Sequence, residues 1–373
     1  MIAIPKKRSQ MEIFRLHIHE KENGKMSKLK AAVIGCGSIA KYRHIPEYAA
    51  NEQVEIVAVC DIVQERAEEM ASQYGAKAYT DYKEVISLAD VDVVSVCLPN
   101  YLHAPVSIAA LRAGKHVLCE KPMATSKEEA EAMIEAANTS GKTLMIAHNQ
   151  RFVASHQKAK EILDSGKLGK VYSFKTTFGH PGPEAWSVDG ADSWFFNKEQ
   201  AFIGAMGDLG VHKSDLMRYL LGEFTEVGAF IETNAKQNTD VDDNAVCILR
   251  TESGIIGTLA ASWAYTAGSG DNSTIIYGEN GTLKLEADPE YSLIEEYRTG
   301  EVVKHQLGKI QTNEEGGQTT THVIDHFIES ILEQKEPLIT GEEGYKSLQV
   351  ILAALESQET KQIVSLKQGV AVK

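Results

Sequence analysis

The sequence predicts an α/β protein of two domains, in which a doubly wound parallel sheet is followed by an α/β domain with a large, mostly antiparallel open sheet. Three observations support this prediction. The 373 residues exceed what one ordinary hydrophobic core accommodates. Up to about residue 147, short apolar runs rich in β-branched residues alternate with helical patterns. Beyond residue 226, strand-like runs follow one another and are separated by turn sequences such as Gly-Glu-Asn-Gly at 278–281.

The first domain contains five buried strands with helices between them. Continuous apolar strands that alternate with helices form a parallel sheet with both faces covered. We expect strands at residues 31–35, 54–61, 91–98, 116–120 and 143–147, and helices at residues 38–50, 63–74, 105–113 and 127–140.

The second domain begins after residue 150 with a helix that ends near residue 165. The elements expected after it are a strand at 171–178, a loop with glycine, proline and tryptophan, a helix at 208–221, strands within 226–306, and helices near 321–333 and 342–358. We therefore assign residues 26–150 to the first domain and 151–373 to the second. Residues 1–25 form a leader with six Lys or Arg and three Glu, which we expect to be disordered or not native.

Composition narrows the class of partner. The net charge of −14 argues against a surface for nucleic acid or anionic membrane, since either needs clustered Lys and Arg. No apolar run approaches the roughly 20 residues that span a bilayer. No Cys/His cluster predicts a metal site. No cysteine lies in a CxxC pair, so we expect buried thiols and a cytoplasmic protein.

A phosphate-binding loop follows the first strand. The segment Gly-Cys-Gly-Ser-Ile-Ala at 35–40 matches the GxGxxG/A pattern between a strand and a helix. Gly35 permits the tight turn, and Gly37 lets the backbone approach a pyrophosphate. Ser38 and Ile39 begin a helix whose free N–H groups face the phosphates. The loop predicts a dinucleotide-binding Rossmann domain, although a plain strand-to-helix turn is an alternative.

Asp61 ends the second strand, 24 residues after Gly37, near the spacing of the acid that accepts the ribose hydroxyls. A carboxylate there repels a 2′-phosphate, and neither Ile62 nor Val63 is basic, so NAD is favoured over NADP. Arg66, one turn into the next helix, keeps NADP as an alternative. Asp61 is also suited to cap that helix, and it could do both.

Three residues are candidates for the chemistry. Asp208 and His212 lie four apart at the start of a helix and so share one face. An imidazole suits the removal of a hydroxyl proton as hydride leaves the same carbon, with Asp208 orienting it or binding a neighbouring hydroxyl. Lys121 follows a strand at the carboxyl edge of the sheet, where a cation can polarise the reacting oxygen. The alternatives are an exposed lysine and an unrelated surface pair.

Four motifs together resemble the glucose–fructose oxidoreductase/inositol dehydrogenase/rhizopine-catabolism (Gfo/Idh/MocA) family over about residues 30–366. They are the glycine loop, Leu-Pro-Asn at 98–100, Glu-Lys-Pro at 120–122 and Asp-Leu-Gly-Val-His at 208–212. The resemblance implies an NAD-dependent oxidoreductase that acts on a secondary alcohol of a sugar, sugar derivative or cyclitol. It also implies a homodimer or homotetramer formed through the C-terminal sheet. An NAD-using glycosidase and a non-catalytic cofactor-sensing protein are alternatives known on this fold.

The resemblance also implies roles for further residues. It implies that Lys121 reaches both the nicotinamide ribose and the substrate hydroxyl. Glu120 either holds the nicotinamide ribose or anchors Lys121. Further residues are expected to contact the cofactor, namely Leu98, Pro99, Asn100 and His103, and others to contact the substrate, namely Asn149, Arg151, His180 and Tyr265. Relatives often carry a Trp-Arg pair where this chain has Trp194 and Phe195, so a contact from that arginine is expected to be absent.

Overall fold

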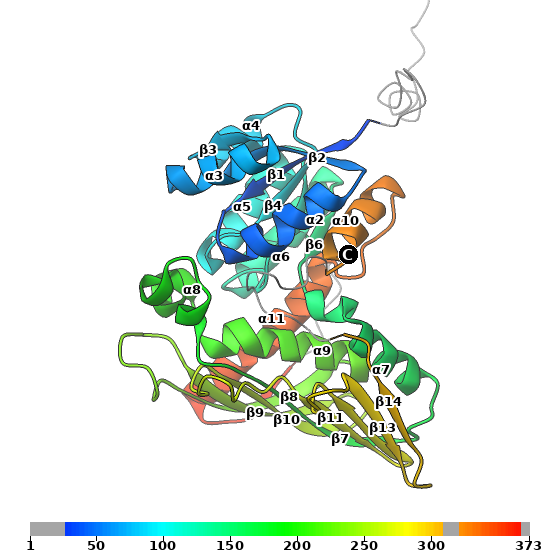
Figure 1. The fold of residues 1–373 in the computed structure, drawn as a ribbon. Helices are drawn as coiled ribbons and strands as arrows, with labels where there is room; N and C mark the ends of the chain where they lie inside the picture. The colour runs from blue at the N-terminus through cyan, green and yellow to red at the C-terminus, as the bar shows by residue number, and fades with distance from the viewer. Residues whose placement is uncertain (1–26, 309–320, 367–373) are drawn as a thin grey trace, which may run out of the picture.

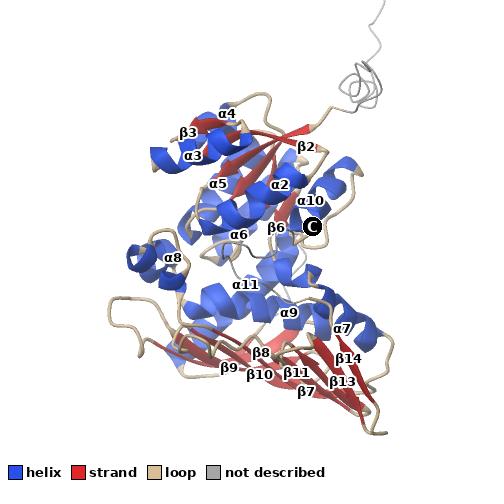
Figure 2. Ribbon diagram, in the orientation of Figure 1, coloured by secondary structure: helices blue, strands red, loops and turns tan. Residues whose placement is uncertain are grey.

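The computed structural model describes residues 27–308 and 321–366, which form two sheet-centred bodies stacked on each other (Figures 1 and 2). The leader expected at residues 1–25 lies outside the described residues. The predicted fold class is confirmed, because a parallel sheet of six strands is followed by a mostly antiparallel sheet of nine.

The first sheet has the strand order β3-β2-β1-β4-β5-β6, which is the order of a dinucleotide-binding Rossmann domain. The five predicted strands are present, and a short sixth, β3, was missed because it has only three half-exposed or exposed residues. The order reverses between β1 and β4, so ligands are expected at the carboxyl ends of these strands. The strands are β1 (Leu29–Ile34), β2 (Val54–Cys60), β3 (Lys77–Tyr79), β4 (Val93–Val96), β5 (His116–Cys119) and β6 (Leu144–Ile146).

Helices cover both faces of this sheet, in keeping with the apolar character of its strands. The predicted helix at 38–50 is confirmed, and its middle is a π-helical segment, η1 (Ala40–His44). The helix expected from residue 105 begins five residues earlier, with Pro105 inside it. The α-helices are α2 (Ile45–Ala50), α3 (Gln64–Tyr74), α4 (Tyr82–Ser87), α5 (Asn100–Arg112) and α6 (Lys127–Ser140).

The second sheet has the order β14-β13-β12-β11-β7-β10-β9-β8-β15, and all of its pairs are antiparallel except β7 with β10. Helices cover one face, and the other is free of helices among the described residues (Figure 2). Its strands are β7 (Val171–Gly179), β8 (Phe224–Glu232), β9 (Asn244–Thr251), β10 (Ile256–Ser262), β11 (Thr274–Gly278), β12 (Gly281–Leu285), β13 (Leu293–Tyr297), β14 (Val302–His305) and β15 (Val364–Ser365).

Most of the remaining helices lie between the sheets or on the loop that leads to α8, and α10 lies beside the first sheet (Figure 1). Together these helices are η2 (Asn149–Phe152), α7 (Ala154–Asp164), η3 (Pro183–Ala185), η4 (Gly190–Asp192), η5 (Trp194–Phe196), α8 (Lys198–Ala201), η6 (Met206–Gly210), α9 (Val211–Leu221), α10 (Val323–Leu332) and α11 (Gly341–Thr360).

Two of these helices do not follow the division expected at residues 150 and 151. Val323, Ile324 and Phe327 of α10 are buried in the Rossmann core. Helix α11 places Leu348 in that core and Ile351 in the core of the second sheet. We infer that the chain returns to the first domain after β14, and that α11 belongs to both. The sequence pattern could not show this, because an apolar helix face does not specify which core it joins.

Candidate active site

The glycine loop turns tightly between β1 and the first helix. Gly35 has a φ of +97°, and a Cβ atom there would lie 2.1 Å from the carbonyl oxygen of Cys97, so the position requires glycine. A Cβ on Gly37 would meet no atom within 4 Å, so the backbone is open on the side that a pyrophosphate would approach. The residues present therefore fit a dinucleotide.

The carboxylate of Asp61 is held by two backbone amides. The Cys36 N–H donates to one oxygen at 2.8 Å, and the Val63 N–H donates to the other at 2.9 Å. Asp61 thus fixes the glycine loop and accepts an N–H group just before α3, whose N-cap is Val63, and its contact with the ribose stays a prediction. It remains half-buried at the end of β2.

A loop of the second domain reaches across to the glycine loop. The Ser38 hydroxyl donates to the Trp186 carbonyl at 2.8 Å, and the Arg66 guanidinium forms an ion pair with Asp189. Next to Ser38, the half-buried Ile39 lines a small pocket together with His44, Glu120 and Asn149. The region expected to hold the cofactor is therefore enclosed by both domains.

Two expected cofactor contacts are instead bound to protein atoms. Asn100 and His103 do not lie in a loop but in the first turn of α5, after Pro99 as its N-cap. The Asn100 amide donates to the Ala201 carbonyl at 2.8 Å and so ties α5 to the second domain. Both ring nitrogens of His103 lie 2.7 Å from carbonyl oxygens, those of Pro122 and Leu98. These bonds support a structural role for the two side chains, and their contact with the cofactor stays a prediction.

Lys121 and Asp208 meet across the boundary between the domains. Lys121 follows β5 at the carboxyl edge of the parallel sheet, and its Nζ donates to Asp208 Oδ1 at 2.7 Å and to the Asp208 carbonyl at 3.1 Å. The Trp263 indole N–H donates to the other carboxylate oxygen at 3.4 Å. The two charged side chains are only 14% and 7% exposed, so water screens the ion pair weakly.

A buried chain of hydrogen bonds lies behind Lys121, and the sequence analysis missed it. Glu120 accepts the Lys121 N–H at 3.1 Å and lies 2.9 Å from His44 Nε2. The other ring nitrogen of His44 lies 3.0 Å from the Ser95 hydroxyl, which contacts the Tyr48 hydroxyl at 2.9 Å. The carboxylate of Glu120 therefore anchors Lys121, one of its two expected roles.

Opposing effects set the charge state of this pair. Burial by itself lowers the pKa of His44, but Cys97 and Glu120 raise it well above its usual value. Burial raises the pKa of Glu120, but His44 and then Lys121 bring it below its usual range. The charged forms of both groups are favoured. In the sequence, His44 could have been recognised only as a polar residue on the side of the first helix that faces the core.

His212 is buried and close enough to Lys121 for the charge of that lysine to act on it. Burial, and then the charge of Lys121, hold the pKa of its imidazole well below the usual value, so the ring is neutral near pH 7. Its Nδ1 is buried without a hydrogen-bond partner, and its ring packs 5.9 Å from that of Phe178. Both ring nitrogens of the nearby His148 are also buried and unpartnered, and burial lowers the pKa of His148 to about 4.

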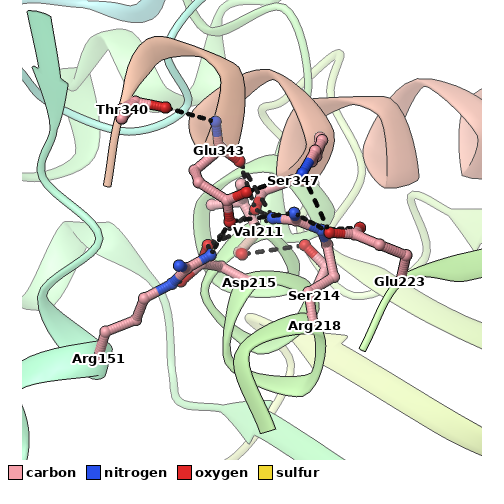
Figure 3. A network of polar contacts seen from close by, with 10 residues as sticks. Arg151, Val211, Ser214, Asp215, Arg218, Glu223, Thr340, Glu343 and Ser347 are labelled. Carbon is pink, nitrogen blue, oxygen red and sulfur yellow. Dashed lines mark hydrogen bonds and ion pairs between the residues drawn. The ribbon is translucent and has the colours of Figure 1, made fainter. Parts of the chain in front are cut away.

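Arg151 is part of a buried ionic network (Figure 3) rather than the substrate site. Its guanidinium donates to both carboxylate oxygens of Asp215, at 2.9 and 2.7 Å, and to Glu343 at 3.0 Å. Arg218 binds the same Glu343 at 3.2 Å and the Ser347 hydroxyl at 2.7 Å. These carboxylates occupy its Nε and Nη2 donors, so the structure favours a role in the network over the expected contact with substrate.

A series of aromatic rings runs from Trp263, beside Asp208, to His212. Trp263, which binds Asp208, lies 6.3 Å from Phe195, and Phe195 lies 5.1 Å from Trp186. From Trp186 the contacts continue through rings 6.4, 6.0 and 5.9 Å apart, namely His180, Phe178 and His212. We call this series the aromatic wall.

The other expected substrate contacts are placed differently. The half-buried His180 belongs to the aromatic wall, and burial lowers its pKa, opposed by the charge of Asp208. Asn149 lines the pocket beside Glu120, with its Oδ1 buried and unpartnered. Tyr265 packs on Gly179, where an added Cβ would lie 2.5 Å from its ring. The structure thus brings Lys121, Asp208, His212 and His180 together.

No group of three or more His, Cys, Asp or Glu side chains within residues 27–308 and 321–366 could hold a metal ion. In the same ranges, no helix combines the length and the apolar character that a membrane span needs.

Comparisons with known proteins match both parts of the chain. Residues 29–148 match the model of the oxidoreductase family with an NAD-binding Rossmann fold, and residues 156–284 match the GFO/IDH/MocA C-terminal domain. The chain is 32% identical to levoglucosan dehydrogenase of Pseudarthrobacter phenanthrenivorans over 290 residues, which cover 69% of this chain and 72% of that protein.

Two further similarities extend over most of the chain. It is 27% identical to myo-inositol 2-dehydrogenase of Thermotoga maritima over 346 residues, or 91% of this chain and 99% of that protein. The structure of levoglucosan dehydrogenase in complex with NADH and levoglucosan superimposes with a TM-score of 0.81 at 27% identity, covering 92% of this chain and all of the other.

Proposed function

The chain belongs to the Gfo/Idh/MocA family of NAD-binding oxidoreductases, and we propose that it transfers a hydride between a secondary alcohol of a sugar, sugar derivative or cyclitol and the nicotinamide of NAD. One observation carries this proposal. Lys121, at the carboxyl edge of the Rossmann sheet, meets Asp208 of the second domain, and His212 follows one turn later. A cation, a carboxylate and a neutral imidazole thereby converge where the two domains meet.

The residues divide the chemistry between them. Oxidation of an alcohol removes a proton from the oxygen and a hydride from the carbon, and NAD⁺, when bound, would supply the hydride acceptor. Lys121 would hold the hydroxyl oxygen and stabilise the negative charge that develops on it. His212 would take the proton, since its lowered pKa keeps the ring unprotonated near pH 7. Asp208 would position Lys121 and accept a hydrogen bond from a neighbouring hydroxyl.

The aromatic wall supports an uncharged substrate with an apolar ring face. Rings such as Trp186 and Phe195 provide flat apolar surface beside the polar end of the site. Arg151, a candidate partner for an acidic group, is already bound to Asp215 and Glu343. The named relatives act on levoglucosan and myo-inositol, both in keeping with this class.

The two alternative functions are not favoured. The relatives are named dehydrogenases, which argues against a glycosidase that oxidises its substrate only transiently. A non-catalytic sensor would not need a shielded cation beside a neutral imidazole.

Two further features complete the proposal. The helix-free face of the second sheet exposes large apolar side chains, including Phe230, Val246 and Ile248, so we propose that it joins subunits into a homodimer or homotetramer. The five cysteines are free and buried, which fits a cytoplasmic protein.

A substrate screen tests the function. We expect NAD⁺ reduction with neutral sugars, anhydrosugars or cyclitols, and weaker turnover with sugar acids. For a verified substrate, Lys121→Met should reduce kcat/KM about 10²- to 10⁴-fold, the range for a positioned acid–base or electrostatic group. Lys127→Met is the matched control, since Lys127 forms an exposed pair with Glu131 on α6. Unchanged turnover in Lys121→Met would contradict the assignment.

A further inference from the structure

We infer that Asp189 is a specificity-determining residue, which disfavours NADP by binding Arg66, an arginine positioned to hold a 2′-phosphate. This inference rests on the proposed function, because it concerns the dinucleotide that the Rossmann domain binds. It involves three residues, of which Asp61 and Arg66 belong to the Rossmann domain and Asp189 to the loop that crosses from the second domain.

The end of β2 is suited to ribose hydroxyls and not to a phosphate. The Asp61 carboxylate is fixed by the N–H groups of Cys36 and Val63, so it cannot turn away from a ribose. The next residue, Ile62, is 90% exposed and offers no donor from its side chain. A 2′-phosphate at this point would therefore face a carboxylate unless a nearby cation compensates.

Arg66 is that cation, and Asp189 already occupies it. Arg66 lies one turn into α3 and close enough to Asp61 for their charges to interact. Its two terminal nitrogens contact the two carboxylate oxygens of Asp189, with the NH1 to Oδ2 distance at 3.5 Å. The two side chains are 30% and 33% exposed, so the pair is partly shielded from water.

The loop that carries Asp189 is held against the Rossmann domain independently of this pair. The Trp186 carbonyl accepts the Ser38 hydroxyl at 2.8 Å. Within the loop, the Asp189 carbonyl accepts the Asp192 N–H at 3.0 Å. Asp189 is therefore positioned by its loop and does not depend on Arg66 to reach the nucleotide site.

Two charge effects disfavour NADP and leave NAD⁺ unaffected. A 2′-phosphate can form a bidentate pair with the terminal nitrogens of Arg66 only in place of Asp189, and the displaced carboxylate would then repel the phosphate. NAD⁺ has hydroxyls in place of the phosphate and incurs neither penalty. The second domain thus contributes to the choice between NAD and NADP. Sequence patterns assign this choice to the Rossmann domain alone.

Binding measurements test the inference without the substrate. The full chain and three variants are titrated with NAD⁺ and NADP⁺ by isothermal calorimetry. Asp189→Asn keeps the shape of the side chain and removes its charge. It should tighten NADP⁺ binding by about tenfold, as one charge-assisted bidentate pair predicts, and change NAD⁺ binding less than twofold. Adding Arg66→Gln to Asp189→Asn should abolish the gain. Asp192→Asn, an exposed acid in the same loop, is the matched control.

The outcomes separate the two proposals. If the wild-type chain binds neither dinucleotide, the proposed function fails. If it binds NAD⁺ but Asp189→Asn has the same ratio of NADP⁺ to NAD⁺ affinity as Asp192→Asn, the inference is overturned and the proposed function stands. A gain that persists in the double variant would overturn the part assigned to Arg66. If Asp189→Asn folds poorly, Asp189→Ser takes its place. This variant shortens the side chain and should show the same gain in NADP⁺ affinity.

Discussion

At the residue scale, the ammonium group of Lys121 affects two neighbours at once. It pairs with Asp208 at 2.7 Å, and it helps to lower the pKa of His212. Burial has the larger effect on His212, and the nearby His148 and Lys213 act in the same direction as Lys121. The imidazole is therefore neutral over a wider pH range than an exposed histidine, which suits a proton acceptor.

The pH dependence of catalysis should reflect this lowered pKa. A protonated imidazole cannot accept a proton, so activity falls where His212 becomes charged. Because its pKa lies below 6.5, kcat/KM for alcohol oxidation should not decline until the pH is well below that value. In Lys121→Met, the loss of a neighbouring positive charge should move this acid limb to higher pH. A wild-type acid limb at or above pH 6.5 would contradict the role of His212.

At the scale of elements, two π-helical segments lie at the two halves of the site. Segment η1 follows the glycine loop and carries His44, the partner of Glu120. Segment η6 carries Asp208 immediately before α9, which carries His212. A π-helical turn contains an extra residue and changes the direction of the side chains after it, and such turns occur often at functional sites. Here η1 contributes His44 as the charged partner of Glu120, and η6 contributes Asp208 as the charged partner of Lys121.

The network around Arg151 links η2, α9 and α11, so its removal should destabilise the fold. Arg151→Ala would leave Asp215 buried with fewer partners, and we expect a loss of about 3–5 kcal/mol in the free energy of unfolding. Arg250→Ala removes an exposed pair with Glu226 and should cost less than about 1 kcal/mol. Urea denaturation followed by circular dichroism measures both variants. Equal losses would show that the network contributes no more than a surface pair.

At the scale of the whole molecule, α11 connects the two bodies. Its first turn packs on β6, where a Cβ on Gly344 would lie 2.5 Å from the Ile146 side chain, and its later residues enter the core of the second sheet. Figure 1 shows this helix running from one body to the other. The contact between Lys121 and Asp208 therefore lies between domains that share a rigid element.

The outer face of the second sheet should control assembly. Ile248 is 55% exposed in β9, beside Gly228 of β8 and Thr258 of β10. Ile248→Glu places a charge in the proposed interface and should weaken association about 10²- to 10³-fold, because a buried unpaired charge is costly. Light scattering after size exclusion measures the molecular mass. Leu338→Glu, at an exposed apolar residue before α11, should leave the mass unchanged. A monomeric wild-type chain would refute the proposal.

Sequence patterns alone predicted most of the elements in their order, the glycine loop and the family. These features are local: an apolar strand, the glycines after it and the helix that follows are adjacent in the chain. The sequence also identified Lys121, Asp208 and His212, because each stands in a short motif at the end of a strand or the start of a helix. The short strand β3 was missed because three residues carry too little pattern.

The partners of the other polar side chains became known only from the folded chain. Asn100 meets a carbonyl 101 residues away, and Arg151 meets carboxylates 64 and 192 residues away. Arg66 meets Asp189 across 123 residues. A side chain binds whichever donors and acceptors the fold brings within about 3 Å. Those partners come from distant segments, so local patterns could locate these residues on their elements but could not show whether they bind a ligand or support the fold.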